Sequence, residues 1–149
     1  MSKKIIALIA ASIATFALSA PAFAVCVKVP QANLRHGPGT DFEKSWEVYQ
    51  YMPFKKIGQE GDWYHVEDMD GDKHWILQGL VSDDIRCAAV NSNNINVRTG
   101  PGTRYAINPL GLIQKYYSFK VLDIQGAWVK VNDSAFDEAW VARSLLWIP

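Results

Sequence analysis

Residues 33–40 read Asn-Leu-Arg-His-Gly-Pro-Gly-Thr, and residues 96–103 read Asn-Val-Arg-Thr-Gly-Pro-Gly-Thr. Further matches follow in the same order. Gly-Asp-Trp in one copy and Gly-Ala-Trp in the other end at Trp63 and Trp128, and each tryptophan is followed by another twelve residues later. Because order and spacing are preserved, the chain beyond its N-terminus is one module of about 60 residues repeated twice.

Both copies have the sequence character of β structure. Proline fixes φ and the flanking glycines allow conformations that other residues resist, so Gly-Pro-Gly predicts a tight turn. Alternation in residues 63–66 and 128–131 predicts a core face of Tyr64, Val66, Val129 and Val131, and an outer face of Trp63, His65, Trp128 and Lys130. No segment after residue 24 shows a sustained helical period with caps. We therefore predict an all-β fold of two tandem small β-barrels.

The N-terminus has the features of an export signal. Lys3 and Lys4 precede an uncharged run over residues 5–18, and Ala22 and Ala24 supply the small side chains that a signal peptidase requires. The run is shorter than the roughly 20 residues that span a bilayer as a helix, which disfavours a retained anchor. We predict a signal peptide over residues 1–24, cleaved after Ala24, and no transmembrane anchor in the mature chain.

The chain has two cysteines, Cys26 and Cys87. An even count in a chain bound for an oxidising compartment favours a disulfide between them over two free thiols. Lipid attachment at Cys26 is disfavoured, because Val25 takes the place where such sites have a small residue. No paired ligand motif surrounds either cysteine, so we expect no metal site there.

Net charge and composition restrict the classes of partner that the protein can bind. The chain carries 15 Lys and Arg against 15 Asp and Glu, and removing Lys3 and Lys4 leaves 13 against 15, a net charge of −2. Such a surface disfavours a nucleic-acid partner, which needs basic residues to contact phosphates. The uncharged stretch 88–92 is the predicted junction, which gives a first barrel over residues 25–88 and a second over residues 89–149.

The repeated Asn-Val-Arg-x-Gly-Pro-Gly-Thr pattern, the following aromatic residues Phe42 and Tyr105, Gly-x-Trp and a late Trp-Val resemble the bacterial SH3 (SH3b) family. The resemblance covers nearly the whole mature chain twice. It implies an SH3-like barrel of five to six strands in each copy, in an exported bacterial protein of a kind that in some members binds peptidoglycan peptides. Residues 45–49, Ser-Trp-Glu-Val-Tyr, are bulkier than the usual aliphatic stretch of the family.

Catalytic and metal motifs have little support in the sequence. No Ser, His and Asp set lies near a recognisable motif, and a cysteine hydrolase needs a free thiol. His36, His65 and His74 are scattered, which favours surface or capping roles. The acidic stretch 67–72 has its glycine at the wrong place for an EF-hand loop and favours a hairpin turn. We expect no catalytic residues, no metal and no cofactor.

Six residues are the candidates for a ligand groove. Trp63 and Trp128 lie on the outer face of their strands, so they either line a groove or cover the edge of each barrel. Trp75 and Trp140 are further candidates at matched positions. Arg35 and Arg98 adjoin the turns, where a guanidinium bonds turn carbonyls, stacks on an aromatic ring or binds a ligand carboxylate.

These features favour a non-catalytic binding module in the bacterial envelope, either in the periplasm or secreted. Its expected partner is a peptide or the peptidoglycan stem or cross-bridge. The alternative is a structural role, in which one barrel packs on the other or on an envelope protein. An enzyme is disfavoured, because the two repeats account for the residues after the leader.

Overall fold

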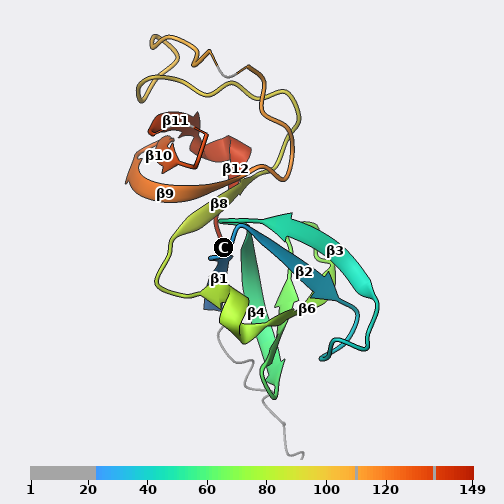
Figure 1. The fold of residues 1–149 in the computed structure, drawn as a ribbon. Helices are drawn as coiled ribbons and strands as arrows, with labels where there is room; N and C mark the ends of the chain where they lie inside the picture. Colours follow the sequence, from blue (N-terminus) through green and yellow to red (C-terminus); the bar gives the residue numbers. More distant parts are fainter. Residues whose placement is uncertain (1–22, 110, 136) are drawn as a thin grey trace, which may run out of the picture.

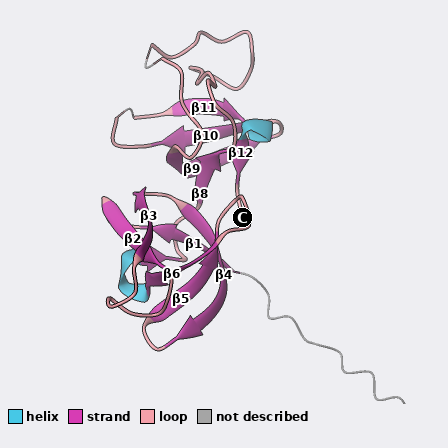
Figure 2. Ribbon diagram, turned by 90° about the vertical axis from the view of Figure 1, so that its right-hand side faces the viewer, coloured by secondary structure: helices cyan, strands magenta, loops and turns pink. Residues whose placement is uncertain are grey.

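The computed structural model describes residues 23–109, 111–135 and 137–149, arranged as two β modules stacked end to end (Figures 1 and 2). The predicted signal peptide lies outside the described residues except for Phe23 and Ala24, which begin the first strand. Cleavage after Ala24 leaves in place the buried residues Val25, Cys26 and Val27 of that strand. No helix in the described ranges is long and apolar enough to cross a membrane.

The first module is a seven-stranded sheet in the order β3-β2-β6-β5-β4-β1-β7, with antiparallel pairing throughout. Its elements are β1 (Phe23–Val27), β2 (Gln31–Arg35), β3 (Lys44–Tyr49), β4 (Pro53–Glu60), β5 (Trp63–Glu67), β6 (Lys73–Leu77), the short 3-10 helix η1 (Gln78–Leu80) and β7 (Val81–Ser82).

The second module repeats this arrangement in a five-stranded sheet of order β11-β10-β9-β8-β12. Its elements are β8 (Cys87–Val90), β9 (Ser118–Gln125), β10 (Trp128–Asn132), β11 (Ala139–Ala142), η2 (Arg143–Leu145) and β12 (Leu146–Trp147). The segment equivalent to β2, residues 95–98, forms isolated bridges and no continuous strand. In one of these bridges Arg98 pairs with Trp140, as Arg35 pairs with Trp75 in the first module. The all-β prediction and the tandem repeat are confirmed.

Hydrogen bonding leaves both sheets open, which is a small departure from the predicted barrels. In the first sheet β3 and β7 lie at opposite ends of the strand order, and in the second sheet β11 and β12 do. β7 and β12 have only two residues each, and each pairs with a single neighbouring strand. The curvature of each sheet still encloses one core per module, centred on Phe54 in the first and Phe119 in the second.

Strand β8 contributes to both cores. All four of its residues are buried. Ala88 and Val90 pack in the second core, while Ala89 between them packs in the first. Alternation along a strand sends successive side chains to opposite faces, and small alanines let the two modules approach this strand closely. The predicted boundary between residues 88 and 89 therefore falls inside a strand that pairs with β9 and β12.

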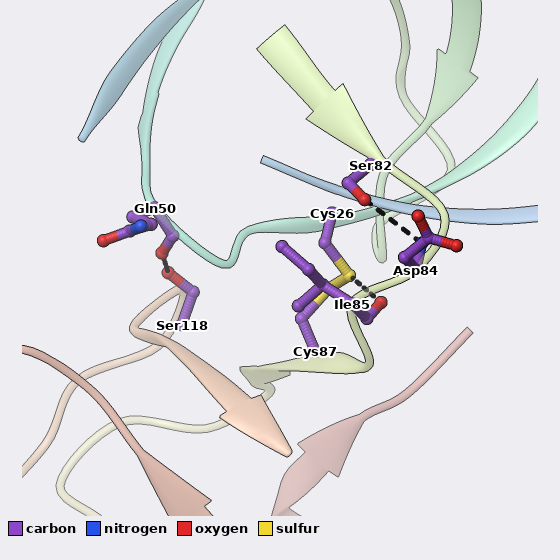
Figure 3. Close-up of a disulfide and its surroundings, with 7 residues drawn as sticks. All are labelled: Cys26, Gln50, Ser82, Asp84, Ile85, Cys87 and Ser118. Carbon is purple, nitrogen blue, oxygen red and sulfur yellow. Dashed lines mark hydrogen bonds between the residues drawn. A yellow bond between two sulfur atoms is a disulfide. The ribbon is translucent and has the colours of Figure 1, made fainter. Parts of the chain in front are cut away.

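The predicted disulfide is confirmed. Cys26 in β1 is bonded to Cys87 at the start of β8, and the described residues contain no free cysteine (Figure 3). Close by, the Ser118 hydroxyl donates a hydrogen bond of 2.7 Å to the Gln50 carbonyl, which also joins the two modules. A disulfide, the apolar packing of β8 and a hydrogen bond thus all join the two modules at the junction.

The first glycine of each Gly-Pro-Gly turn is required by close approach of an aromatic ring, not by an unusual φ. None of these four glycines has a positive φ, which corrects the conformational reason inferred from the sequence. A Cβ atom on Gly37 would lie 2.3 Å from Cδ1 of Phe42, and one on Gly100 would lie 2.3 Å from Cδ1 of Tyr105. The aromatic residue after each turn covers the glycine.

We expect Gly37→Ala and Gly100→Ala each to lower the free energy of unfolding by about 1–3 kcal/mol, because the added methyl group must displace an aromatic ring. Chemical unfolding measures the loss. Gly79→Ala is the matched control, since a Cβ there meets no atom within 4 Å and its φ is not positive. The control should change stability by less than about 0.5 kcal/mol. Equal losses in all three variants would contradict the close-approach explanation.

Candidate functional site

The outer face of the first sheet brings three predicted residues together. Trp63 and His65 alternate with the core residues of β5, and His65 lies opposite Trp75 on β6. The His65 and Trp75 rings stack at 4.4 Å with planes 9° apart. Arg35 lies opposite Trp75 on the other side. Burial, followed by the charge of Lys73, lowers the pKa of His65, so its neutral form faces the tryptophan at neutral pH.

The second sheet has an equivalent row of outer side chains, in which a lysine replaces the histidine. Trp140 lies between Lys130 of β10 and Arg98, and Trp128 occupies the place of Trp63. Lys130 replaces His65 and pairs with Glu138 at 2.5 Å. All four predicted tryptophans are half-buried, and each pairs with strands of its own sheet. The outer faces predicted by alternation are confirmed, whereas a groove along them stays a prediction.

The two predicted arginines bond turn carbonyls. Arg35 Nη1 donates to the Phe42 carbonyl at 2.7 Å. Arg98 Nη1 donates to the Thr103 and Tyr105 carbonyls at 3.0 Å each. Of the roles that the sequence left open, this structural one is observed in both copies, and it fixes the turn against the strand that precedes it. Binding of a ligand carboxylate by either guanidinium stays a prediction.

A Ser, His and Asp set that sequence motifs did not reveal lies beneath β3. The Ser45 hydroxyl lies 2.8 Å from His74 Nδ1, and Asp68 Oδ2 lies 3.2 Å from His74 Nε2. Asp68 Oδ1 also accepts the backbone N–H groups of Asp70 and Asp72 at 2.9 Å each. Asp68 and His74 are buried. These contacts order the hairpin loop and attach it to β3.

That set is peculiar to the first module. Ala139 takes the place of His74 in the second copy, and the corresponding carboxylate, Asp133, accepts a hydrogen bond from the Tyr117 hydroxyl instead. Within residues 23–109, 111–135 and 137–149, no group of three or more His, Cys, Asp and Glu residues could hold a metal ion. The acidic stretch 67–72 acts as a hairpin loop organised by Asp68.

Sequence reasoning also missed a cavity of about 540 Å³ between the two modules. None of the six predicted site residues lines it. The residues that do line it are Pro30, Trp46, Glu47, Val48, Tyr49, Gln50, Tyr51, Met52, Gln114, Lys115, Tyr116, Tyr117, Ser118, Asp133 and Ser134. The bulky stretch 45–49 was the one sequence feature that could have indicated this cavity. Its aromatic side chains Trp46 and Tyr49 line the space where the second module packs against the first.

Two small antiparallel β modules, each with an arginine-bound Gly-Pro-Gly turn followed by an aromatic residue, define a class of small, strongly curved β domains. Residues 28–83 match one bacterial SH3 domain family and residues 93–146 match a second. The chain belongs to the bacterial SH3 domain family, as two domains in tandem.

A curated relative and two solved structures are similar to this chain. The chain is 25% identical over 150 residues to the "Putative N-acetylmuramoyl-L-alanine amidase YrvJ" of Bacillus subtilis (strain 168), covering 89% of this chain and 28% of that protein. NlpC2 from Trichomonas vaginalis matches with a TM-score of 0.38 at 12% identity, over 87% of this chain and 49% of its own. NlpC1 from the same organism gives 0.37 at 11%, over 95% and 51%. The chain thus spans about a quarter of the curated relative.

Proposed function

We propose that this protein is a non-catalytic, exported binding module that recognises peptide or peptidoglycan material in the bacterial envelope. The observation that carries the proposal is the aromatic row on the outer face of each sheet, Trp63 with Trp75 and Trp128 with Trp140. Half-exposed aromatic rings give a ligand large contact area at low entropic cost. Two matched rows on one rigid chain would also let weak sites gain by avidity on a repetitive polymer.

Four findings support the proposal. Bacterial SH3 domains are consistent with a cell-wall binding module, and the partial relative bears the name of an amidase of N-acetylmuramoyl-L-alanine, a cell-wall unit. The Cys26–Cys87 disulfide fits an oxidising compartment, for which we propose the periplasm rather than the medium. The four candidate tryptophans lie on the outer faces of the sheets, whereas Trp46 and Trp147 contact the other module.

Binding of the full mature chain to purified cell-wall sacculi tests the proposal. We expect Trp63→Ala/Trp128→Ala to reduce the bound fraction by at least ~10-fold, because a few aromatic anchors usually dominate affinity. The matched control is Ile57→Ala/Leu122→Ala, which removes exposed apolar side chains at equivalent places on β4 and β9. The control should bind like the wild type. Separate halves are avoided as probes, since cutting at the junction removes Ala89 from the first core.

The competing structural role makes different predictions for the same proteins. In that case the wild type does not sediment with sacculi, and each tryptophan substitution costs about 3 kcal/mol or more in unfolding. A stable Trp63→Ala/Trp128→Ala protein that binds sacculi fully would rule out the outer faces as the binding surface. Hydrolysis of sacculi by the wild type would overturn the non-catalytic part of the proposal.

A further inference from the structure

The cavity between the modules has two aromatic walls that touch at one end. One wall is β3 and the turn after it, over residues 46–52, and the other is formed by residues 114–118 and 133–134. The rings of Trp46 and Tyr116 meet edge to face at 5.3 Å. Tyr116 Oη also donates to Asp70 Oδ2 at 2.5 Å, and Lys115 Nζ lies 2.9 Å from Asp70 Oδ1. These contacts join the two modules at that end of the cleft.

Backbone hydrogen-bonding groups are available along the first wall. Within the described ranges β3 pairs with β2 alone, so its other side is a sheet edge. The Gln50 N–H donates to the Pro30 carbonyl across the β2–β3 ladder at 3.2 Å. Since hydrogen-bonded residues alternate along an antiparallel strand, the N–H groups of Glu47 and Tyr49 point away from β2. An edge of this kind can accept an extended peptide as an added strand.

The charges of the cleft favour a cationic occupant. Its charged lining residues are Glu47, Asp133 and Lys115, and the ammonium of Lys115 is already paired with Asp70. Among the described residues, Glu47 forms an ion pair with the exposed Lys44 at 3.0 Å. Exposed pairs of this kind contribute little, so a ligand ammonium can compete for the carboxylate.

The aromatic side chains add a second attraction for a cation. Tyr49 is 63% exposed, so its ring is open to a ligand, whereas the Tyr116 ring already has the Lys115 ammonium 4.7 Å from its centroid. An ammonium group over an aromatic ring is attracted by the ring quadrupole. A carboxylate in the same place faces Glu47 and Asp133. A neutral glycan can stack on the rings and hydrogen-bond to the carboxylates, but it brings no positive charge to them.

We propose that the cleft binds an extended peptide that carries a primary amine, with the peptide added as a strand to the free edge of β3 and its ammonium placed between the Glu47 carboxylate and the Tyr49 ring, which lie on the same face of that strand. The site is separate from the outer tryptophan rows. It stands whether or not those rows bind the cell wall.

The test uses the full oxidised chain and three blocked pentapeptides. The first is acetyl-Ala-Val-Lys-Val-Ala-amide, the second has norleucine in place of lysine, and the third carries backbone N-methyl groups. Calorimetric titration gives affinity, and backbone amide NMR shifts locate the site. We expect saturable binding of the lysine peptide with shifts at residues 46–52 and 114–118. Norleucine should weaken binding about 3- to 30-fold through loss of the ammonium, and N-methylation about 10-fold through lost edge hydrogen bonds.

Variants separate the cleft from the outer faces. Glu47→Gln changes a half-buried side chain and Tyr49→Ala an exposed one, and each should weaken the lysine peptide about 3- to 10-fold without changing the unfolding midpoint. Trp63→Ala/Trp128→Ala should leave this affinity unchanged, whatever it does to sacculus binding. Equal affinity for lysine and norleucine peptides, or no saturable binding at millimolar peptide, overturns the proposal. So does binding of a chitooligosaccharide in the cleft that excludes the peptide.

Discussion

Phe54→Ala and Phe119→Ala should each lower the free energy of unfolding by about 3–5 kcal/mol. The two phenylalanines hold equivalent places at the start of β4 and β9, both are fully buried, and each is the largest buried side chain of its core. Removing the ring leaves a cavity that the surrounding strands cannot fill without giving up their pairing. Denaturant unfolding followed by tryptophan fluorescence measures the loss.

Both substitutions should shift one common unfolding transition. β8 supplies Ala89 to the first core and Ala88 and Val90 to the second, so neither module can lose its core and leave the other intact. Calorimetry of the two variants checks this coupling. Ile57→Ala, an exposed position on β4, is the control and should cost less than about 0.5 kcal/mol. Two separated transitions in either phenylalanine variant would contradict the shared strand.

Removal of the disulfide should cost about 4 kcal/mol, because Cys26 and Cys87 are 61 residues apart and the bond restricts a long loop of the unfolded chain. Both positions are buried, so Cys26→Ala/Cys87→Ala is preferred to serine, which would bury hydroxyl groups without partners. Denaturant unfolding of the oxidised wild type, the reduced wild type and the double variant gives the comparison.

The reduced wild type and the alanine variant should agree, since both lack the cross-link and differ little in packing. A thiol assay on the unfolded, unreduced protein should find no reactive thiol. A loss of less than about 1 kcal/mol in both proteins would show that the packing of β8, not the covalent bond, holds the modules together. Equal stability of the reduced and the oxidised wild type would lead to the same conclusion.

The sequence could predict those features that depend on local pattern. The repeat gave the tandem organisation, the alternation at Trp63 and Trp128 gave the outer faces, and the cysteine count gave the disulfide. The reason for the turn glycines was wrong, because it considered backbone conformation alone. That error has a physical origin: the Phe42 ring that excludes a Cβ on Gly37 arrives through packing, which no local pattern expresses.

Features that require distant segments to meet could not be predicted from the sequence. The hydrogen bonds of Ser45 and Asp68 to His74 join residues of β3, the hairpin loop and β6. The cleft exists only because residues 114–118 lie against β3, and contacts such as that between Trp46 and Tyr116 cross the module boundary. Module boundaries inferred from composition likewise could not show that an uncharged, alanine-rich stretch is a strand shared by two cores.

The shared strand also sets the order in which the protein can be completed. A chain is made from its N-terminus, and an N-terminal domain generally folds before the rest follows. Here the first module lacks Ala89 and the partner of Cys26 until the segment 87–90 has emerged. The unfinished module therefore keeps an exposed apolar surface until residues 87–90 are available to it. When β8 takes its place, it completes the first core and supplies the first strand of the second sheet at the same time.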